Sequence, residues 1–217
     1  MKYPVLIFII VMIAACARTE DQPRQESSVE SAAGFDSSRI LMMRAEKDKF
    51  FGTSPQSPIP DSMRGEFEGL NYYPPAAEFF VRADVIRFDN PDTVEILTTK
   101  DDDIRKMLKF ARLEFSIKGS KLSLIAYKSP RAPEHLFVPF TDRTSGRGTY
   151  AGGRYIDVEY AEDTETVALD FNLAYSPYCA CNPRYSCPLV PEENSLDAAI
   201  EAGEKYFKME TINSEKY

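Results

Sequence analysis

Apolar and polar residues alternate along several separate stretches in the middle of the chain. The clearest case flanks Lys118-Gly119-Ser120, with apolar residues at every second position from Ala111 to Ile117 before it and from Leu122 to Ala126 after it. Successive side chains of a β-strand point to opposite faces of the sheet, so this alternation predicts strands with one buried face. The short glycine-containing link between them predicts a β-hairpin.

The full set of alternating stretches predicts a mainly β domain of about eight antiparallel strands, arranged as a sandwich or a partly open barrel. The stretches cover residues 79–85, 93–99, 111–117, 122–126, 136–140, 154–160 and 167–171. Before them, Ser37 or Ser38 is expected to cap one N-terminal helix that runs to Phe51. Residues 197–205 contain strong helix formers, although the apolar residues from Leu196 to Ala202 also alternate.

The chain is acidic, with 34 Asp and Glu residues against 26 Lys and Arg residues. A nucleic-acid-binding surface needs positive charge, so we expect no nucleic-acid partner. Of the 217 residues 43% are hydrophobic, which is enough to bury the core of one domain. We place this single β-rich domain at residues 37–210.

The first residues resemble a bacterial lipoprotein signal. Lys2 precedes an apolar run from Val5 to Ile13, and Ala14-Ala15-Cys16 follows it. The run is shorter than the roughly 20 residues that a membrane-spanning helix needs. The resemblance implies that residues 1–15 are a signal peptide and that Cys16 carries the lipid that holds the protein on the membrane. An ordinary secretory signal with an incidental cysteine is the alternative.

The segment that follows Cys16 is rich in Glu, Gln, Ser and Arg. It has almost nothing to bury, so residues 16–36 are expected to form a flexible tether. Ala17, rather than an aspartate, follows the cysteine. In similar lipoproteins this favours the outer membrane, so we expect a lipid-anchored protein of the cell envelope that faces the periplasm.

The position of Arg154 within its alternating stretch predicts that its side chain is buried. Arg154 has the same parity as Ile156 and Val158, so it shares their core-facing side of the strand. A buried charge without a partner costs several kcal/mol, so an acidic partner is required. Asp142 and Glu193 are the candidates. Asp170 and Asn172 fall on the other face, where we expect them to fix the chain as it leaves its strand.

A polar turn rich in glycine and tyrosine precedes Arg154 and suggests a ligand site. Arginine and tyrosine are common recognition residues, and the guanidinium suits a carboxylate or phosphate. The predicted ligand-binding residues are Asp142, Ser145, Thr149, Tyr150, Arg154, Tyr155, Glu193 and Asn194. The alternative is a loop whose side chains cap its own backbone amides.

Three cysteines, Cys179, Cys181 and Cys187, lie close together near the C-terminus. In an oxidising compartment a close pair is expected to be bridged, so we predict a disulfide between Cys179 and Cys187, with Cys181 left over. The short loop that it closes is worth about 2.5 kcal/mol. Thiol–disulfide exchange is one alternative. A zinc site is another, although the spacing is irregular and a fourth ligand is missing.

Several long motifs resemble the bacterial domain-of-unknown-function family 1684. They are F-E-G-L-N-Y-Y at 67–73, P-F-T-D-R-T-S-G-R-G-T-Y-A-G-G-R-Y-I-D at 139–157, and D-F-N-L-A-Y-S-P-Y-C-A at 170–180. The resemblance covers about residues 38–208 and implies a secreted or lipid-anchored protein without an established activity. It also implies a short edge strand over 196–204. Cys181 departs from the family, where an aromatic residue is usual.

These features predict a non-catalytic binding module for a small anionic ligand or an envelope partner. The alternative is an envelope enzyme of thiol-redox or hydrolytic type. A hydrolytic triad of Ser145, His135 and an acid lacks the expected strand-to-helix nucleophile turn. We therefore predict no catalytic residue, no metal and no cofactor.

Overall fold

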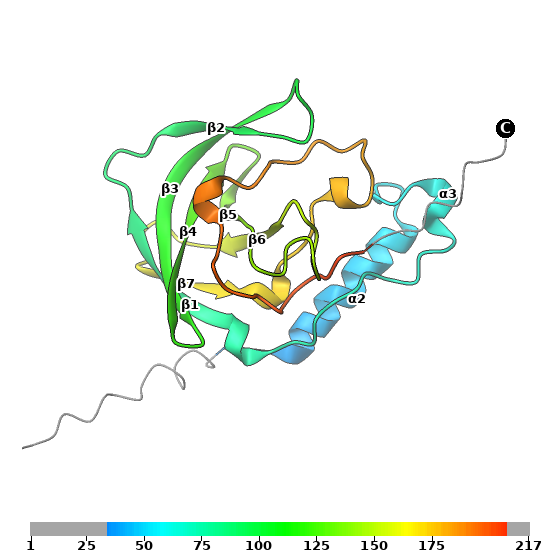
Figure 1. Ribbon diagram of the computed structural model, residues 1–217, viewed down its shortest axis with the longest axis horizontal. Coiled ribbons are helices and arrows are strands. Elements are labelled where there is room, and N and C mark those ends of the chain that lie inside the picture. Colours follow the sequence, from blue (N-terminus) through cyan, green and yellow to red (C-terminus); the bar gives the residue numbers. More distant parts are fainter. Residues whose placement is uncertain (1–33, 208–217) are drawn as a thin grey trace, which may run out of the picture.

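The computed structural model describes residues 34–207. The predicted signal peptide, Cys16 and most of the tether lie outside the described residues. The described chain begins with the helix α2 (Ser37–Thr53) and the short helix α3 (Asp61–Arg64), and then enters a β-sheet (Figure 1). Neither helix has the length and apolar character needed to cross a membrane.

The sheet contains seven strands, all paired antiparallel. They are β1 (Phe80–Arg87), β2 (Thr93–Leu97), β3 (Ile104–Ile117), β4 (Ser120–Ser129), β5 (Ala132–Phe140), β6 (Arg154–Glu159) and β7 (Thr166–Asp170). The strand order is β6-β5-β4-β3-β1-β7, and β2 pairs with the other end of β3. Because the end strands β6 and β7 contact each other, the sheet is nearly closed into a barrel. The predicted mainly β fold is confirmed, with seven described strands instead of about eight.

The hairpin between β3 and β4 forms where the sequence predicts it. Ile117 pairs with Ser120, so Lys118 and Gly119 alone make the turn. Both have positive φ angles, 50° and 80°. Two consecutive positive values define the type I′ turn, whose twist matches that of the flanking strands.

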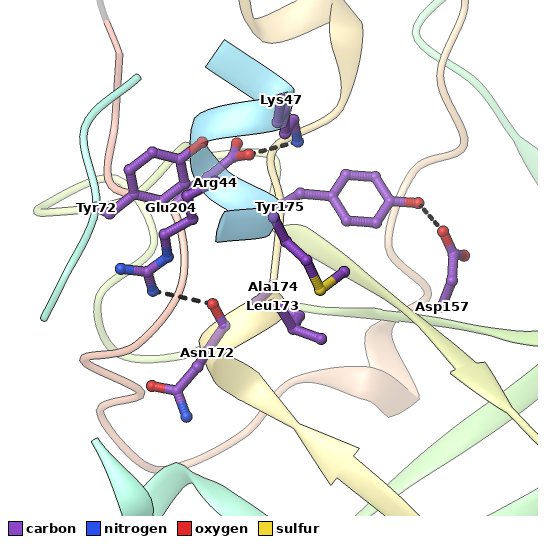
Figure 2. A pocket seen from close by; sticks show the side chains of 10 residues that line it. Arg44, Lys47, Tyr72, Asp157, Asn172, Leu173, Ala174, Tyr175 and Glu204 are labelled. Atoms are coloured by element: carbon purple, nitrogen blue, oxygen red, sulfur yellow. Dashed lines mark hydrogen bonds and ion pairs between the residues drawn. The ribbon is translucent and has the colours of Figure 1, made fainter. Parts of the chain in front are cut away.

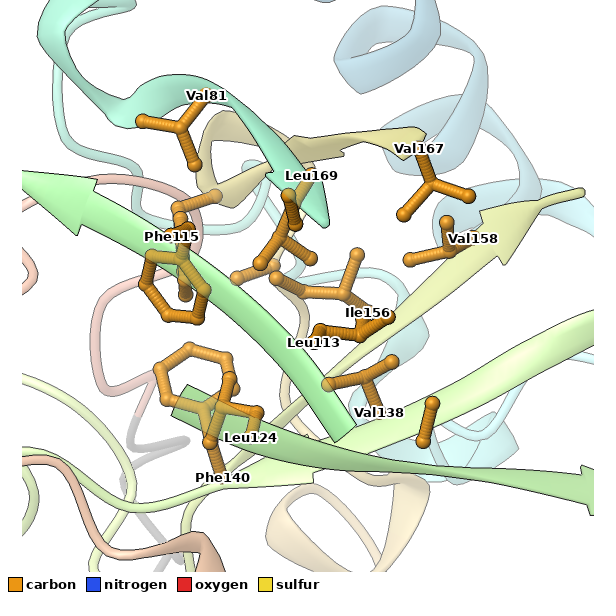
Figure 3. Close-up of a cluster of buried hydrophobic side chains, with 14 of the residues drawn as sticks. Val81, Leu113, Phe115, Leu124, Val138, Phe140, Ile156, Val158, Val167 and Leu169 are labelled. Carbon is orange, nitrogen blue, oxygen red and sulfur yellow. The ribbon is translucent and has the colours of Figure 1, made fainter. Parts of the chain in front are cut away.

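The inward-facing side chains of the strands fill the barrel, as Figure 3 shows for ten labelled core residues. Phe171, in the single turn η2 (Phe171–Leu173), packs edge-on against Phe140 at 5.3 Å between ring centroids. Its ring centroid lies 5.5 Å from that of Phe115, with the two rings tilted by 50°. One aromatic contact set therefore joins β3, β5 and the turn that follows β7.

The helix α2 is capped differently from the prediction. The side chain of Asp36, not that of Ser37 or Ser38, accepts hydrogen bonds from the amides of Ser38 and Arg39 at 2.9 and 3.1 Å. A carboxylate satisfies free amides at a helix start and also suits the helix dipole. The helix lies beside the barrel, near the end of β7 (Figure 1).

Single turns connect the remaining segments. They are η1 (Ala77–Phe79), η3 (Tyr178–Ala180) and η4 (Glu192–Asn194). As predicted, Asp170 and Asn172 fix the chain where it leaves β7, because Asp170 accepts from the amide of Asn172 at 2.9 Å. The side chain of Asn172 in turn bonds both the amide and the carbonyl of Ala76.

The segment after Ser195 is neither the helix nor the edge strand that the sequence suggested. Leu196, Ile200 and Ala202 are buried, so the apolar alternation does mark core contacts. The backbone bends at several residues and forms only isolated bridges, which pair Ser195 with Thr141 and Glu204 with Tyr72. Some of its carbonyls accept hydrogen bonds from the buried side chain of Arg154, and others from the amides of Arg143 and Tyr73.

Candidate functional site

Arg154 is buried, as its parity predicts, and Asp142 is its partner. The residue is 0% exposed, and its Nη2 lies 3.3 Å from Oδ1 of Asp142. The same guanidinium donates to the carbonyls of Ile200, Ala202 and Glu204. The N–H donors of the Arg154 guanidinium are therefore used within the protein, where they help to hold the C-terminal segment on the barrel.

Asp142 organises the glycine-rich turn beside Arg154. Its carboxylate accepts from the amide of Thr144 at 3.1 Å and from the amide of Ile200 at 2.8 Å. Hydroxyls complete the network: Ser145 bonds Asp142 at 3.2 Å, and Thr149 bonds Thr144 at 3.0 Å. Four predicted ligand-binding residues thus come together, but they bond to each other.

The other four predicted ligand-binding residues lie elsewhere. Tyr155 is buried, and its hydroxyl donates to the carbonyl of Pro188. Glu193 bonds Lys109 and Tyr127, at 2.6 and 2.7 Å. Asn194 is fully buried beside β4, and Tyr150 stacks on Tyr206. The ligand-binding role of these residues stays a prediction, and the structure divides them among separate places.

A cavity of about 290 Å³ lies between α2 and the barrel, and we call it the α2 cavity (Figure 2). The helix contributes Met43, Arg44 and Lys47, the chain after β7 contributes Asn172 to Tyr175, and Tyr72, Asp157 and Glu204 complete the lining. None of these residues was predicted as a ligand site. The chemical character of the cavity therefore follows from its lining side chains.

Arg44 and Lys47 lie one helical turn apart, so both point from α2 toward the cavity (Figure 2). Arg44 is 8% exposed and donates to the carbonyls of Tyr73 and Asn172 at 2.7 and 3.0 Å. Its Nε has no hydrogen-bond partner among residues 34–207. Burial lowers the pKa of Arg44, an effect that the nearby Tyr72 and acidic side chains oppose.

Lys47 is the more accessible of the two cations, with 26% of its side chain exposed. Its Nζ lies 2.5 Å from Oε1 of Glu204, and 4.8 Å from the centre of the Tyr175 ring. The other carboxylate oxygen of Glu204 accepts from the amide of Ser176 at 2.8 Å. Glu204 is thus fixed on both sides, whereas Lys47 has one ion pair and an aromatic neighbour.

The opposite end of the cavity holds a tyrosine and a second acid. The hydroxyl of Tyr175 donates to Asp157 at 2.8 Å (Figure 2). Burial raises the pKa of Tyr175, and the adjacent carboxylate adds to that effect. Tyr175 therefore stays a neutral hydrogen-bond donor, and it presents an aromatic face to the cavity.

Sequence reasoning missed this site because its two walls come from distant segments. Lys47 and Glu204, which form its central ion pair, are 157 positions apart. The only local signal was the spacing of Arg44 and Lys47 on the predicted helix, which places two cations on one face. On a helix such a pair is usually solvent-facing, so the spacing alone does not indicate a cavity.

The cysteines form a second cluster. Cys179, Cys181 and Cys187 are all free thiols, so the predicted bridge between Cys179 and Cys187 is not formed in the structure. The two cysteines nevertheless lie side by side. The amide of Cys179 also donates to the sulfur of Cys187 at 3.2 Å. The structure therefore brings Cys179 and Cys187 together without the predicted disulfide between them.

The remaining chemical candidates are not assembled. Ser145 donates to Asp142, whereas His135 lies beside Glu134 on β5, so these contacts do not make a hydrolytic triad. Within residues 34–207, no three His, Cys, Asp or Glu side chains are placed to hold a metal ion. The three cysteines accordingly lack the arrangement of a zinc site.

A family comparison identifies the chain. The model of the family described as "Protein of unknown function (DUF1684)" matches residues 65–205. The chain belongs to the DUF1684 family. The DUF1684 match includes all seven strands and the far wall of the α2 cavity, whereas Arg44 and Lys47 precede it.

A solved structure resembles this DUF1684 chain. It is the solution NMR structure of an uncharacterized protein from Haloarcula marismortui, which is 41% identical in sequence, with a TM-score of 0.62. The alignment covers 77% of this chain and 92% of the other. A search of curated proteins found no match. The family indicated by the motifs is confirmed, while the lipid anchor stays a prediction.

Proposed function

We propose that this DUF1684 chain is a non-catalytic binding protein of the cell envelope that takes up a small anionic molecule in the α2 cavity. The observation that best supports the proposal is the placement of Arg44 and Lys47 beside one cavity. The other walls carry tyrosine rings and the apolar side chains of Met43 and Leu173. Ligand pockets commonly combine mostly apolar walls with a few fixed polar groups.

Lys47 is the group that we expect to meet the anion. A lysine ammonium has three N–H donors, and Glu204 accepts from one of them. The remaining donors are available to a carboxylate or phosphate oxygen. The acids in the lining have partners of their own, because Glu204 bonds Lys47 and Asp157 bonds Tyr175.

The cavity limits the size of the ligand. Its volume of about 290 Å³ is at the small end of the range for ligand pockets. Tyr72 and Tyr175 offer ring faces, and Met43 and Leu173 offer aliphatic contacts. We therefore expect one anionic group on a short apolar or aromatic body.

Calorimetric titration with benzoate, hexanoate and inorganic phosphate tests the proposal, with benzamide as the uncharged analogue of benzoate. We expect a carboxylate to bind and benzamide to bind more weakly. Lys47→Gln is expected to weaken carboxylate binding about tenfold, because a hydrogen bond to a charged group is lost. Glutamine retains an amide donor for Glu204, so the ion-pair partner is not left unbonded.

Lys49→Gln is the matched control, because Lys49 is exposed on the same helix. It removes the same charge and is expected to leave the affinity unchanged. The absence of binding by all three anions would contradict the proposal. An equal loss of carboxylate affinity in Lys47→Gln and Lys49→Gln would also contradict the proposal, because it would indicate a general effect of net charge.

The location in the envelope rests on the lipoprotein-like signal that ends at Cys16. Full-length protein expressed in a Gram-negative host is expected to be cleaved before Cys16 and to carry acyl chains on that residue, which mass spectrometry of the N-terminal peptide measures. Several acyl chains together give stable membrane attachment, so Cys16→Ser is expected to move the protein to the soluble fraction. An unmodified Cys16 in membrane-associated wild-type protein would refute the anchor.

A further inference from the structure

Backbone hydrogen bonds position both Cys179 and Cys187 where they meet. Cys187 joins the end of β2, because its carbonyl accepts from the amide of Thr99 at 2.9 Å. Its amide donates back to the hydroxyl of Thr99 at 3.2 Å. Cys179 lies in η3, with its amide 3.2 Å from the sulfur of Cys187. Hydrogen bonds therefore place the two cysteines next to each other before a disulfide forms.

The two cysteines differ in access to solvent. Cys187 is 7% exposed, whereas Cys179 is only partly buried. An incoming reagent therefore reaches Cys179 first. The hydrogen bond from the Cys187 thiol lowers the pKa of Cys179 to about 7, and the hydroxyl of Tyr150 acts in the same direction. The same contact raises the pKa of Cys187.

Cys181 has a different environment from this pair. Burial raises its pKa to about 11, and the nearby charge of Glu204 adds to the effect. A thiol in such a place carries little thiolate at neutral pH and reacts slowly. Cys179 is thus distinguished from Cys181 by its contact with Cys187 and by the lower pKa of its thiol.

We propose that Cys179 and Cys187 are a reversible dithiol site that exchanges with low-molecular-weight disulfides such as oxidised glutathione. The Cys179 thiolate attacks one sulfur of the reagent, so a mixed disulfide forms and one thiolate leaves. Cys187 then loses its proton to solvent and attacks the sulfur of Cys179. The second thiolate of the reagent leaves, and the protein has lost two hydrogens while the reagent has become two thiols.

The structure favours both directions of this exchange. The cysteines are already in contact in the reduced form, so the oxidised form requires only a shift of the two sulfurs to bonding distance, about 2.05 Å. Reduced glutathione reaches the half-buried Cys179 by the same route. A purely structural bridge, in contrast, is buried and resists reduction by small thiols.

The test uses the purified protein equilibrated with oxidised or reduced glutathione and then trapped with iodoacetamide. Peptide mass mapping is expected to show a Cys179–Cys187 disulfide after oxidation, with Cys181 not bridged, and no disulfide between Cys179 and Cys187 after return to reduced glutathione. A bridge that involves Cys181, or no bridge, would overturn the proposal. A Cys179–Cys187 bridge that reduced glutathione leaves intact would overturn its reversibility.

The resolving role of Cys187 has its own test. Cys187→Ala is expected to accumulate at least about tenfold more glutathione adduct on Cys179, because the second attack is lost. Its alkylation at neutral pH is expected to slow, because the thiol that lowers the pKa of Cys179 is gone. Cys181→Ala is the matched control and should behave like wild type. If Cys187→Ala does not fold by circular dichroism, Cys187→Ser replaces it, and the adduct on Cys179 remains the deciding readout. An adduct level equal to that of wild type would exclude the resolving role.

Discussion

Replacing Arg154 with methionine is expected to lower the free energy of unfolding by about 3–5 kcal/mol, because the change leaves the buried carboxylate of Asp142 without its charge partner. Asp142 is 7% exposed, so water does not replace the guanidinium. The carbonyls of Ile200 and Ala202 lose their donor at the same time. Urea denaturation followed by circular dichroism measures the effect.

Arg143→Met is the control. Arg143 is next in sequence to Asp142, but its ion pair is exposed, whereas that of Arg154 is buried. Its partner is Asp197, and the two side chains are 61% and 88% exposed. Exposed pairs contribute about 0–1 kcal/mol, so the change should be small. An Arg154 variant as stable as the Arg143 variant would show that the buried network does not hold the fold.

The same substitution links the core to the α2 cavity. Arg154 donates to the carbonyl of Glu204 at 3.3 Å, while the carboxylate of Glu204 pairs with Lys47. Loss of Arg154 therefore removes several of the hydrogen bonds that position the segment carrying Glu204. A folded Arg154 variant is expected to lose ligand binding even though Arg154 does not line the cavity.

Replacing Asn194 with alanine is expected to destabilise the protein by about 3 kcal/mol, because three buried backbone groups lose their partner. The side chain of Asn194 accepts from the amide of Ile125 at 2.8 Å and donates to its carbonyl at 2.9 Å. It also donates to the carbonyl of Pro139 at 2.6 Å. One amide thus ties the C-terminal segment to β4 and β5.

Thermal and urea unfolding of Asn194→Ala measure this cost, with Asn90→Ala as control. Asn90 is exposed between β1 and β2, so its replacement should leave the stability nearly unchanged. The sequence proposed Asn194 as a ligand contact. A variant with wild-type stability and impaired ligand binding would support that role against the structural one.

Local patterns in the sequence determined the strands and the direction in which key side chains point. The alternation from Ala111 to Ala126 predicted the hairpin of β3 and β4, because burial on one face of a strand repeats every two residues. The same periodicity placed Arg154 in the core and required an acid beside it, which is Asp142. These features depend on neighbours in the chain, so the chain order alone contains them.

The tertiary structure alone decided the conformation of residues 196–204. Their apolar alternation was compatible with a strand, and their composition with a helix. The carbonyls of Ile200, Ala202 and Glu204 accept hydrogen bonds from Arg154. Those of Ala198 and Gly203 accept from the amides of Arg143 and Tyr73, so distant parts of the chain hold the segment without a regular strand. The partners of this segment are distant in the sequence, so no local pattern predicts its conformation.

The α2 cavity was decided in the same way. Lys47, Tyr175 and Glu204 meet only because the barrel brings the end of β7 and the C-terminal segment against α2. The sequence predicted the helix and the strand that leads to Tyr175 separately. Their contact depends on how the closed sheet packs against the helix, which is a property of the whole fold.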